Sequence, residues 1–147
     1  MKLYIAAADA DGRSHVASTT ELEDTRVVHV WDGSLEDIAR TVAGMEPGPD
    51  VAIEPPAGGA RWVYTRFPAD ADAAAWGYTP MGFHCTRTID FDFLVSGELD
   101  CVLDDETVQL DAGDFIVLRA VNHRWVNRGD GVATMLCLLH QPLAPAA

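Results

Sequence analysis

Short runs of alternating apolar and polar residues fill the chain from Met81 to about residue 140, and turn residues interrupt them about every eight to twelve positions. This pattern is typical of an all-β sandwich or barrel, because alternate side chains of a strand face opposite sides of its sheet. It predicts strands over 82–88, 90–96, 98–103, 107–111, 115–119, 123–127 and 132–140. We therefore expect the second half of the chain to be the core of an all-β fold.

The first part of the chain is less regular, and it predicts additional strands and one short helix. Leu3–Ala8, Arg26–Trp31 and Arg61–Phe67 contain many of the residues that favour strands. Ser34 is followed by acidic residues, as at a capped helix start, and Gly44 is placed to end that helix.

The length of 147 residues is that of about one domain. We expect residues 1–80 to contribute strands, the helix and loops that pack on a core formed by residues 81–141. Residues 142–147 are rich in alanine and proline, which predicts a frayed end.

Charge and cysteine content narrow the classes of function. The chain has 23 acidic and 10 basic residues, a net charge of −13, which disfavours nucleic acid and anionic membrane surfaces as partners. No stretch reaches the roughly 18 apolar residues of a membrane span, and the N-terminus lacks a signal-length apolar core, so we expect a soluble, cytoplasmic protein. Cys85, Cys101 and Cys137 are odd in number and widely spaced, which fits a reducing compartment.

One predicted strand has an unusual polar face. His84, Thr86, Thr88, Asp90 and Asp92 alternate with mostly apolar residues and so share one side of it. Inside a barrel such a row would line a wet cavity.

A second histidine, His123, lies on another predicted strand. With His84 and Asp90 it could form a set of two imidazoles and one carboxylate that holds a metal ion. The alternative is a metal-free interior in which water and mutual hydrogen bonds satisfy these groups.

The spacing of these residues resembles the two motifs of the cupins, which are small β-barrels with a central metal. The stretch from His84 through Thr86 and Asp90 to Gly97 fits the first motif, with Thr86 at its second histidine and Asp90 at its glutamate. His123 and Asn127 fit the end of the second motif. The resemblance covers about residues 80 to 140, in the manner of small single-domain cupins of the cupin 2 type.

Three features depart from the family pattern. Gly82 lies too close to His84 to be the glycine that opens the first motif, and Arg119–Val121 replaces the central proline and glycine of the second. Thr86 replaces an imidazole with a hydroxyl, which binds divalent ions weakly.

The resemblance implies a cupin-type jelly-roll β-barrel that holds one divalent metal ion, with iron, manganese, zinc and nickel as candidates. His84, Asp90 and His123 are the expected ligands, and Thr86 is expected to hydrogen-bond a metal-bound water. Cupins commonly dimerise through extra N-terminal strands, so a homodimer paired at Leu3–Ile5 or Val27–Trp31 is expected.

The function that follows is a metal-dependent enzyme acting on a small organic metabolite, by decarboxylation, dehydration or isomerisation with the metal as Lewis acid. Asp92 is the candidate proton carrier, Arg119 the candidate partner of a substrate carboxylate, and Trp125 the candidate pocket wall. Each has a structural alternative: a solvated strand edge, a surface arginine and a core tryptophan. The alternative functions are a non-haem iron dioxygenase and a small-ligand-binding module without catalysis.

Overall fold

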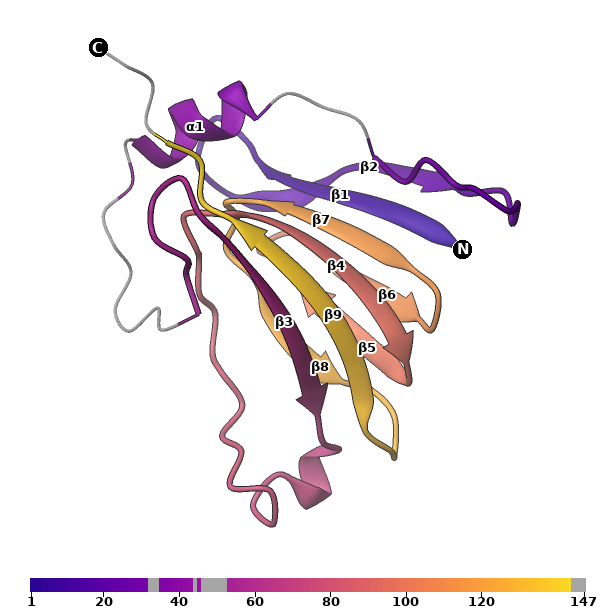
Figure 1. The fold of residues 1–147 in the computed structure, drawn as a ribbon. Helices are drawn as coiled ribbons and strands as arrows, with labels where there is room; N and C mark the ends of the chain where they lie inside the picture. Colours follow the sequence, from indigo (N-terminus) through magenta and orange to yellow (C-terminus); the bar gives the residue numbers. More distant parts are fainter. Residues whose placement is uncertain (32–34, 44, 46–52, 144–147) are drawn as a thin grey trace.

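The computed structural model describes residues 1–31, 35–43, 45 and 53–143, and in these residues it contains two β-sheets, one α-helix and one short 3-10 helix. The larger sheet has the strand order β2–β1–β7–β4–β9–β3 (Figure 1). Its strands are β1 (Lys2–Ala8), β2 (Ser14–Glu21), β3 (Ala60–Phe67), β4 (Ile89–Ser96), β7 (Phe115–Arg119) and β9 (Ala133–His140). The smaller sheet, in the order β6–β5–β8, contains β5 (Glu98–Val102), β6 (Thr107–Asp111) and β8 (Arg124–Asn127).

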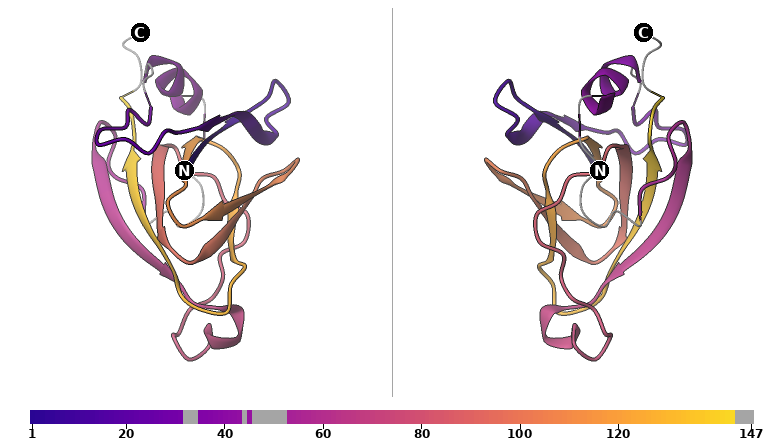
Figure 2. Two further views of the ribbon diagram at one scale, coloured as in Figure 1. Left: turned by 90° about the vertical axis from the view of Figure 1, so that its right-hand side faces the viewer. Right: turned by 90° about the vertical axis from the view of Figure 1, so that its left-hand side faces the viewer.

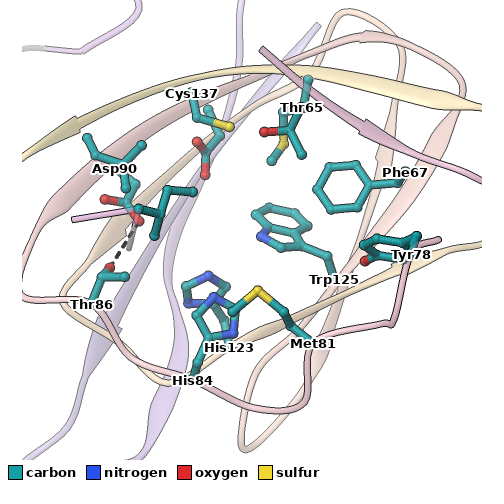
Figure 3. A pocket seen from close by; sticks show the side chains of 14 residues that line it. Thr65, Phe67, Tyr78, Met81, His84, Thr86, Asp90, His123, Trp125 and Cys137 are labelled. Carbon is teal, nitrogen blue, oxygen red and sulfur yellow. Dashed lines mark hydrogen bonds between the residues drawn. The ribbon is translucent and has the colours of Figure 1, made fainter. Parts of the chain in front are cut away.

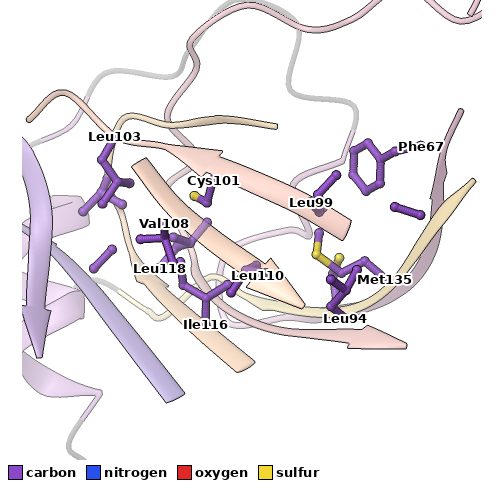
Figure 4. Packing of buried hydrophobic residues seen from close by; sticks show 14 of the residues in the cluster. Phe67, Leu94, Leu99, Cys101, Leu103, Val108, Leu110, Ile116, Leu118 and Met135 are labelled. Carbon is purple, nitrogen blue, oxygen red and sulfur yellow. The ribbon is translucent and has the colours of Figure 1, made fainter. Parts of the chain in front are cut away.

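The two sheets lie opposite one another, with the helix outside the space between them (Figure 2). Their facing sides enclose the main apolar core, which is drawn in part in Figure 4. This core includes Leu94, Leu99, Leu110, Ile116, Leu118 and Met135, all almost fully buried. The expected all-β, jelly-roll type of fold is confirmed, as two facing sheets.

All of the predicted strands from residue 90 onward are confirmed to within one residue at each end, as are those at Leu3–Ala8 and Arg61–Phe67. The strand predicted at Arg26–Trp31 is wrong, because this segment makes no strand pairing, although Val30 and Trp31 pack on the larger sheet. The strand predicted over 82–88 is also wrong: only an isolated bridge between His84 and His123 forms there. β2 was not predicted, since its mainly polar sequence lacks an apolar face.

A second apolar cluster lies on the outer side of the larger sheet. The helix α1 (Glu36–Ala43) buries Ile38 and Val42 against Ile89 of β4 and Val117 of β7. The helix expected after Ser34 therefore forms, and its apolar side chains face the sheet. The predicted cap Ser34 and the predicted terminator Gly44 lie outside the described residues.

Gly97 joins β4 to β5 in a backbone conformation with φ of +85°. A Cβ at this position would lie 2.7 Å from the Cα of Ala133. The turn therefore needs glycine for both its conformation and its close approach to β9.

β1 occupies an interior place in its sheet, antiparallel to β2 and parallel to β7. Because both of its edges are hydrogen-bonded, Leu3–Ile5 is not free to pair with a second copy. Within the described residues no helix is long and apolar enough to span a membrane.

Candidate functional site

A cavity of about 130 Å³ lies between the two sheets (Figure 3). It is lined by Ile53, Thr65, Phe67, Tyr78, Met81, His84, Thr86, Asp90, Asp92, His123, Trp125, Met135, Cys137 and Leu139. Most of this lining is apolar or aromatic, with a few polar groups. Such a composition is that of a small-molecule site.

The alternation of β4 brings the polar row to this cavity. Asp90, Asp92 and Leu94 are buried on the inner side, whereas Phe91 contacts the outer cluster. Asp90 and Asp92 reach the cavity together with His84 and Thr86, which precede the strand.

His84 and His123 form an imidazole pair on one wall. Their backbones exchange two hydrogen bonds of 2.9 Å, and their ring centroids lie 4.4 Å apart. The chain reaches His123 through Ala120, whose φ of +52° is unusual for a residue with a side chain.

Each imidazole is oriented by a nearby carbonyl. His84 Nδ1 lies 3.1 Å from the carbonyl oxygen of Gly82, and His123 Nδ1 lies 3.0 Å from that of Val121. A carbonyl only accepts hydrogen bonds, so Nδ1 carries the proton in each ring. Nε2 is then left with the free lone pair.

Asp90 lies on another wall of the cavity, the carboxyl wall, in a network with two threonines. The Thr88 hydroxyl donates to Asp90 Oδ1 and lies 2.7 Å from the hydroxyl oxygen of Thr86, which itself lies 3.3 Å from Asp90 Oδ2. Burial raises the pKa of Asp90 to about 6, although the threonine hydrogen bonds act in the opposite direction.

Asp92 is the second buried carboxyl that lines the cavity. Burial, together with the neighbouring charge of Asp90, raises its pKa well above the ordinary value, although a hydrogen bond with Cys137 opposes this. Burial therefore favours the protonated form of Asp92.

Burial has the reverse effect on His123. It lowers the pKa of His123 to about 4, with a further contribution from the charge of His84. His123 is therefore neutral at physiological pH, so the cavity combines a neutral imidazole with a carboxyl whose protonated form is favoured.

The three predicted metal ligands line the same cavity, but they do not assemble as a ligand group. Among the residues that the structure describes, no group of three or more His, Cys, Asp and Glu side chains is arranged to hold a metal ion. Figure 3 shows the Asp90 carboxylate turned toward Thr86, while His84 and His123 lie together near Met81. Thr86 thus contacts the carboxylate of Asp90, and the expected set of three ligands does not fit this geometry.

The two predicted substrate contacts have different positions. Trp125 lines the cavity, with its ring centroid 5.7 Å from that of His123 and 6.1 Å from that of Phe67. Arg119 ends β7 with the parity of Phe115 and Val117, which belong to the outer cluster. The structure does not bring Arg119 to the cavity.

Several lining residues were missed from the sequence. Thr65 and Phe67 of β3 and Cys137 of β9 follow the inward parity of their strands, and this alternation was the available signal. Tyr78 and Met81 come from loop segments without periodicity, so no sequence signal indicated them.

An ion pair fixes the segment that carries Ile53 to the cavity. Glu54 accepts hydrogen bonds from the backbone nitrogen of Arg87 at 2.6 Å and from its guanidinium group at 3.1 and 3.3 Å. Its carboxylate is almost fully buried. Charge-assisted bonds of this kind hold the segment against the chain that leads into β4.

Residues 79–139 match the family model Cupin_2, described as the cupin domain. None of the curated proteins compared with the chain matches it.

Solved structures with a similar fold include a conserved protein of unknown function from Streptococcus pyogenes, at 18% identity and a TM-score of 0.46, covering 60% of this chain and 67% of that one. A cupin 2 conserved barrel domain protein from Salinispora arenicola matches at 18% identity and a TM-score of 0.46, covering 65% and 71%. The cupin domain of Schizosaccharomyces pombe Cnp3 matches at 9% identity and a TM-score of 0.48, covering 95% and 87%.

Proposed function

We propose that this protein, in which residues 79–139 are a cupin domain, is an enzyme that moves a proton on a small organic metabolite, as an isomerase or a dehydrating lyase. The observation that supports the proposal is that the His84–His123 imidazole pair and the buried carboxyl of Asp92 line one cavity. Two titratable groups whose environments shift their pKa values in opposite directions form an acid and a base.

The cavity limits the size and polarity of the substrate. Its volume of about 130 Å³ is close to the roughly 150 Å³ that accommodates a benzene molecule. The substrate therefore has about six non-hydrogen atoms. The aromatic surfaces of Phe67, Tyr78 and Trp125 favour a weakly polar body with one or two oxygen functions.

The residues of the two walls have complementary roles. The imidazole pair accepts a proton at Nε2 from a carbon next to a carbonyl group, where such protons are most acidic. Asp92 donates its carboxyl proton to a departing hydroxyl group, which leaves as water, or to the neighbouring atom in an isomerisation. Solvent then restores both protonation states, and the cycle requires no net change of charge.

Hydrogen–deuterium exchange in small carbonyl compounds tests this proposal. A panel of ketones, keto acids and hydroxy acids within the size limit would be incubated with the protein in D₂O and followed by proton NMR. We expect the wild-type protein to exchange the proton next to the carbonyl of at least one compound. His84→Gln, His123→Gln and Asp92→Asn should each slow this exchange by about 100-fold or more.

The matched controls are His29→Gln and Asp105→Asn, which alter an exposed histidine and a carboxylate outside the cavity. Both should retain the wild-type rate. Equal rates in the cavity variants and in the controls would refute the assignment of acid and base.

A divalent ion is the basis of a second candidate function, because both imidazoles orient Nε2 lone pairs by the same Nδ1–carbonyl contact. They could supply two of the ligands of iron, manganese, zinc or nickel, with Lewis-acid or dioxygenase chemistry. Exchange that survives EDTA treatment favours the metal-free reaction. Activity that returns only with an added ion favours the metal-dependent enzyme, and oxygen uptake identifies the dioxygenase.

A binding module without catalysis is the remaining alternative. It predicts saturable binding of a compound from the same panel, with no exchange and no turnover under any metal condition. Isothermal titration beside the NMR experiment distinguishes it from both enzymes.

A further inference from the structure

No lysine or arginine lines the cavity. The chain has 10 residues of these two types, all within the part that the structure describes, and none of them is among the lining residues. The lining does include the carboxyl groups of Asp90 and Asp92. A carboxyl group supplies no positive charge in either protonation state. An anionic ligand would therefore have no lysine or arginine as a partner in this site.

The arginines that neighbour lining residues along the chain have other contacts. The guanidinium carbon of Arg66 on β3 lies 4.5 Å from the ring centroid of Trp76, and that of Arg124 on β8 lies 5.3 Å from the ring centroid of Phe83. Their neighbours on each strand line the cavity, so strand alternation directs these two arginines away from it. Arg87 is held by its ion pair with a buried glutamate.

The imidazole pair adds two hydrogen-bond acceptors to the site. The Nδ1 protons of His84 and His123 are directed to backbone carbonyls, which leaves a lone pair on each Nε2. The hydroxyl oxygen of Thr86 lies 3.3 Å from Asp90 Oδ2 and has only one proton to donate. A ligand carboxylate, which only accepts hydrogen bonds, would meet lone pairs at these positions. A ligand hydroxyl group, in contrast, can donate to an imidazole.

The cavity has a polar side and an aromatic side. Figure 3 shows the carboxyl group of Asp90 on one side and the rings of Phe67 and Tyr78 on the other. A ligand that fits both sides has one polar end and one apolar end. A carboxylate buried in such surroundings loses its hydration and gains no cationic partner in exchange, which is costly.

We propose that the site takes an uncharged metabolite, a hydroxy ketone or hydroxy aldehyde, and excludes carboxylates of the same size. This inference rests on the proposed function, which requires a carbonyl group beside an acidic C–H bond, and it specifies the substrate class. The hydroxyl group of the substrate donates to one imidazole, and its apolar end lies against Phe67 and Tyr78. Arg119, expected from the sequence to bind a substrate carboxylate, does not line the cavity and has no such role.

Protein NMR titration with matched ligands tests the proposal. Lactamide and lactate have the same number of non-hydrogen atoms and differ in charge, and acetoin carries a ketone beside its hydroxyl group. All titrations contain EDTA, so that a bound metal ion cannot supply the missing cation. We expect acetoin and lactamide to shift the Trp125 indole N–H signal and to bind at least about 30-fold more tightly than lactate, because the carboxylate would be buried without a partner.

Met81→Arg supplies a cation at the cavity. Met81 lines it and is 52% exposed, so the substitution is compatible with folding, which circular dichroism verifies. Lactate binding should strengthen by about tenfold through a charge-assisted hydrogen bond, while acetoin binding should change by less than about twofold. Phe83→Arg is the matched control, since Phe83 is 48% exposed in the same segment and does not line the cavity. It should leave both affinities unchanged.

The proposal is overturned if wild-type protein binds lactate as tightly as lactamide, or if it binds neither uncharged compound saturably. Tighter binding of 1-amino-2-propanol, a cation of similar size, than of lactamide would also overturn it, as would equal effects of the two arginine variants on lactate binding.

Exchange in D₂O separates this inference from the proposed reaction. Acetoin that binds without exchanging its C–H protons contradicts the reaction and leaves the ligand class standing. Exchange in a keto acid by the wild-type protein, with none in acetoin, contradicts the ligand class and leaves the reaction standing.

Discussion

One imidazole and two carboxyls of the cavity are buried to a similar extent, yet burial acts on them in opposite directions. His123 on the imidazole wall is 3% exposed, and Asp90 and Asp92 on the carboxyl wall are 5% and 4% exposed. An imidazole loses its charge by releasing a proton, whereas a carboxylate loses its charge by binding one. The same apolar surroundings therefore favour the neutral form of His123 and the protonated form of Asp90 and Asp92.

The walls also differ in what holds them. Each imidazole is fixed by a backbone carbonyl two residues earlier in its own segment, at Gly82 and Val121. Asp90 depends instead on the side chains of Thr86 and Thr88. The imidazole wall is thus determined by local backbone shape, while the carboxyl wall can be altered by single side-chain substitutions.

The largest expected effect is the pH dependence of the contribution of His123 to stability, which differs in sign from that of the carboxyl wall. Its folded pKa of about 4 lies below the ordinary unfolded value of about 6.5. Its contribution to stability is thus complete above pH 6.5 and is lost as the pH falls toward 4. Relative to His123→Gln, the metal-free wild-type protein should lose about 3 kcal/mol over this interval. Urea unfolding in EDTA at several pH values measures the difference, and parallel curves would contradict it.

The contribution of Asp90 to stability should change with pH in the opposite direction, over an overlapping pH range. Its folded pKa of about 6 lies above the ordinary value of 3.8, so its contribution to stability is present at low pH. That contribution is lost as the pH rises from about 4 to about 6 and amounts to about 2 to 3 kcal/mol relative to Asp90→Asn. The same urea titrations measure it. Two variants that deviate from wild type in the same direction would refute the contrast between the walls.

The sequence was sufficient to predict the carboxyl wall, because a strand has a fixed period. Alternation placed Asp90 and Asp92 on one side of β4 and Phe91 on the other, which needs no knowledge of the rest of the fold. His84 and Thr86 reach the same cavity although the strand predicted through them does not form.

Distances across the cavity could not be predicted in this way. The spacing of His84, Asp90 and His123 placed all three in one cavity, but whether their donor atoms converge depends on side-chain torsions and hydrogen-bond partners. Thr88 was seen only as a member of the polar row, although its hydroxyl helps to orient the Asp90 carboxylate.

The positions of loop residues and the pairing of edge strands could not be predicted from the sequence either. Tyr78 and Met81 reach the cavity from segments without a period. β2 forms because its backbone hydrogen-bonds to β1 at the edge of the larger sheet. The segment Arg26–Trp31 packs against that sheet but does not pair with any of its strands. Both outcomes depend on tertiary contacts that local composition does not encode.

A smaller effect is expected from Thr88→Val, which acts only on the carboxyl wall. The substitution keeps the side-chain shape but removes the hydroxyl that donates to Asp90, leaving a buried carboxylate less well hydrogen-bonded. We expect a loss of about 1–3 kcal/mol of stability at neutral pH. The pKa of Asp90 should rise further, because this hydrogen bond normally lowers it.

Chemical denaturation and carboxyl-carbon NMR titration measure the two consequences of Thr88→Val. Thr107→Val, at an exposed position on β6, is the matched control and should change stability by no more than about 0.5 kcal/mol. A Thr88 variant that behaves like this control would show that the threonine network does not support the wall.

The smallest effect is expected from Arg119→Ala, because Arg119 belongs to neither wall. Its parity on β7 is that of the outer cluster, so its guanidinium group does not face the cavity. The affinity of a cavity ligand should change by less than about twofold, as for a substitution away from the site. Trp125→Ala should weaken the same ligand far more, since its indole lines the cavity beside His123. Calorimetric titration of both variants with one compound makes the comparison, and a tenfold loss in Arg119→Ala would mean that the ligand extends beyond the space between the sheets.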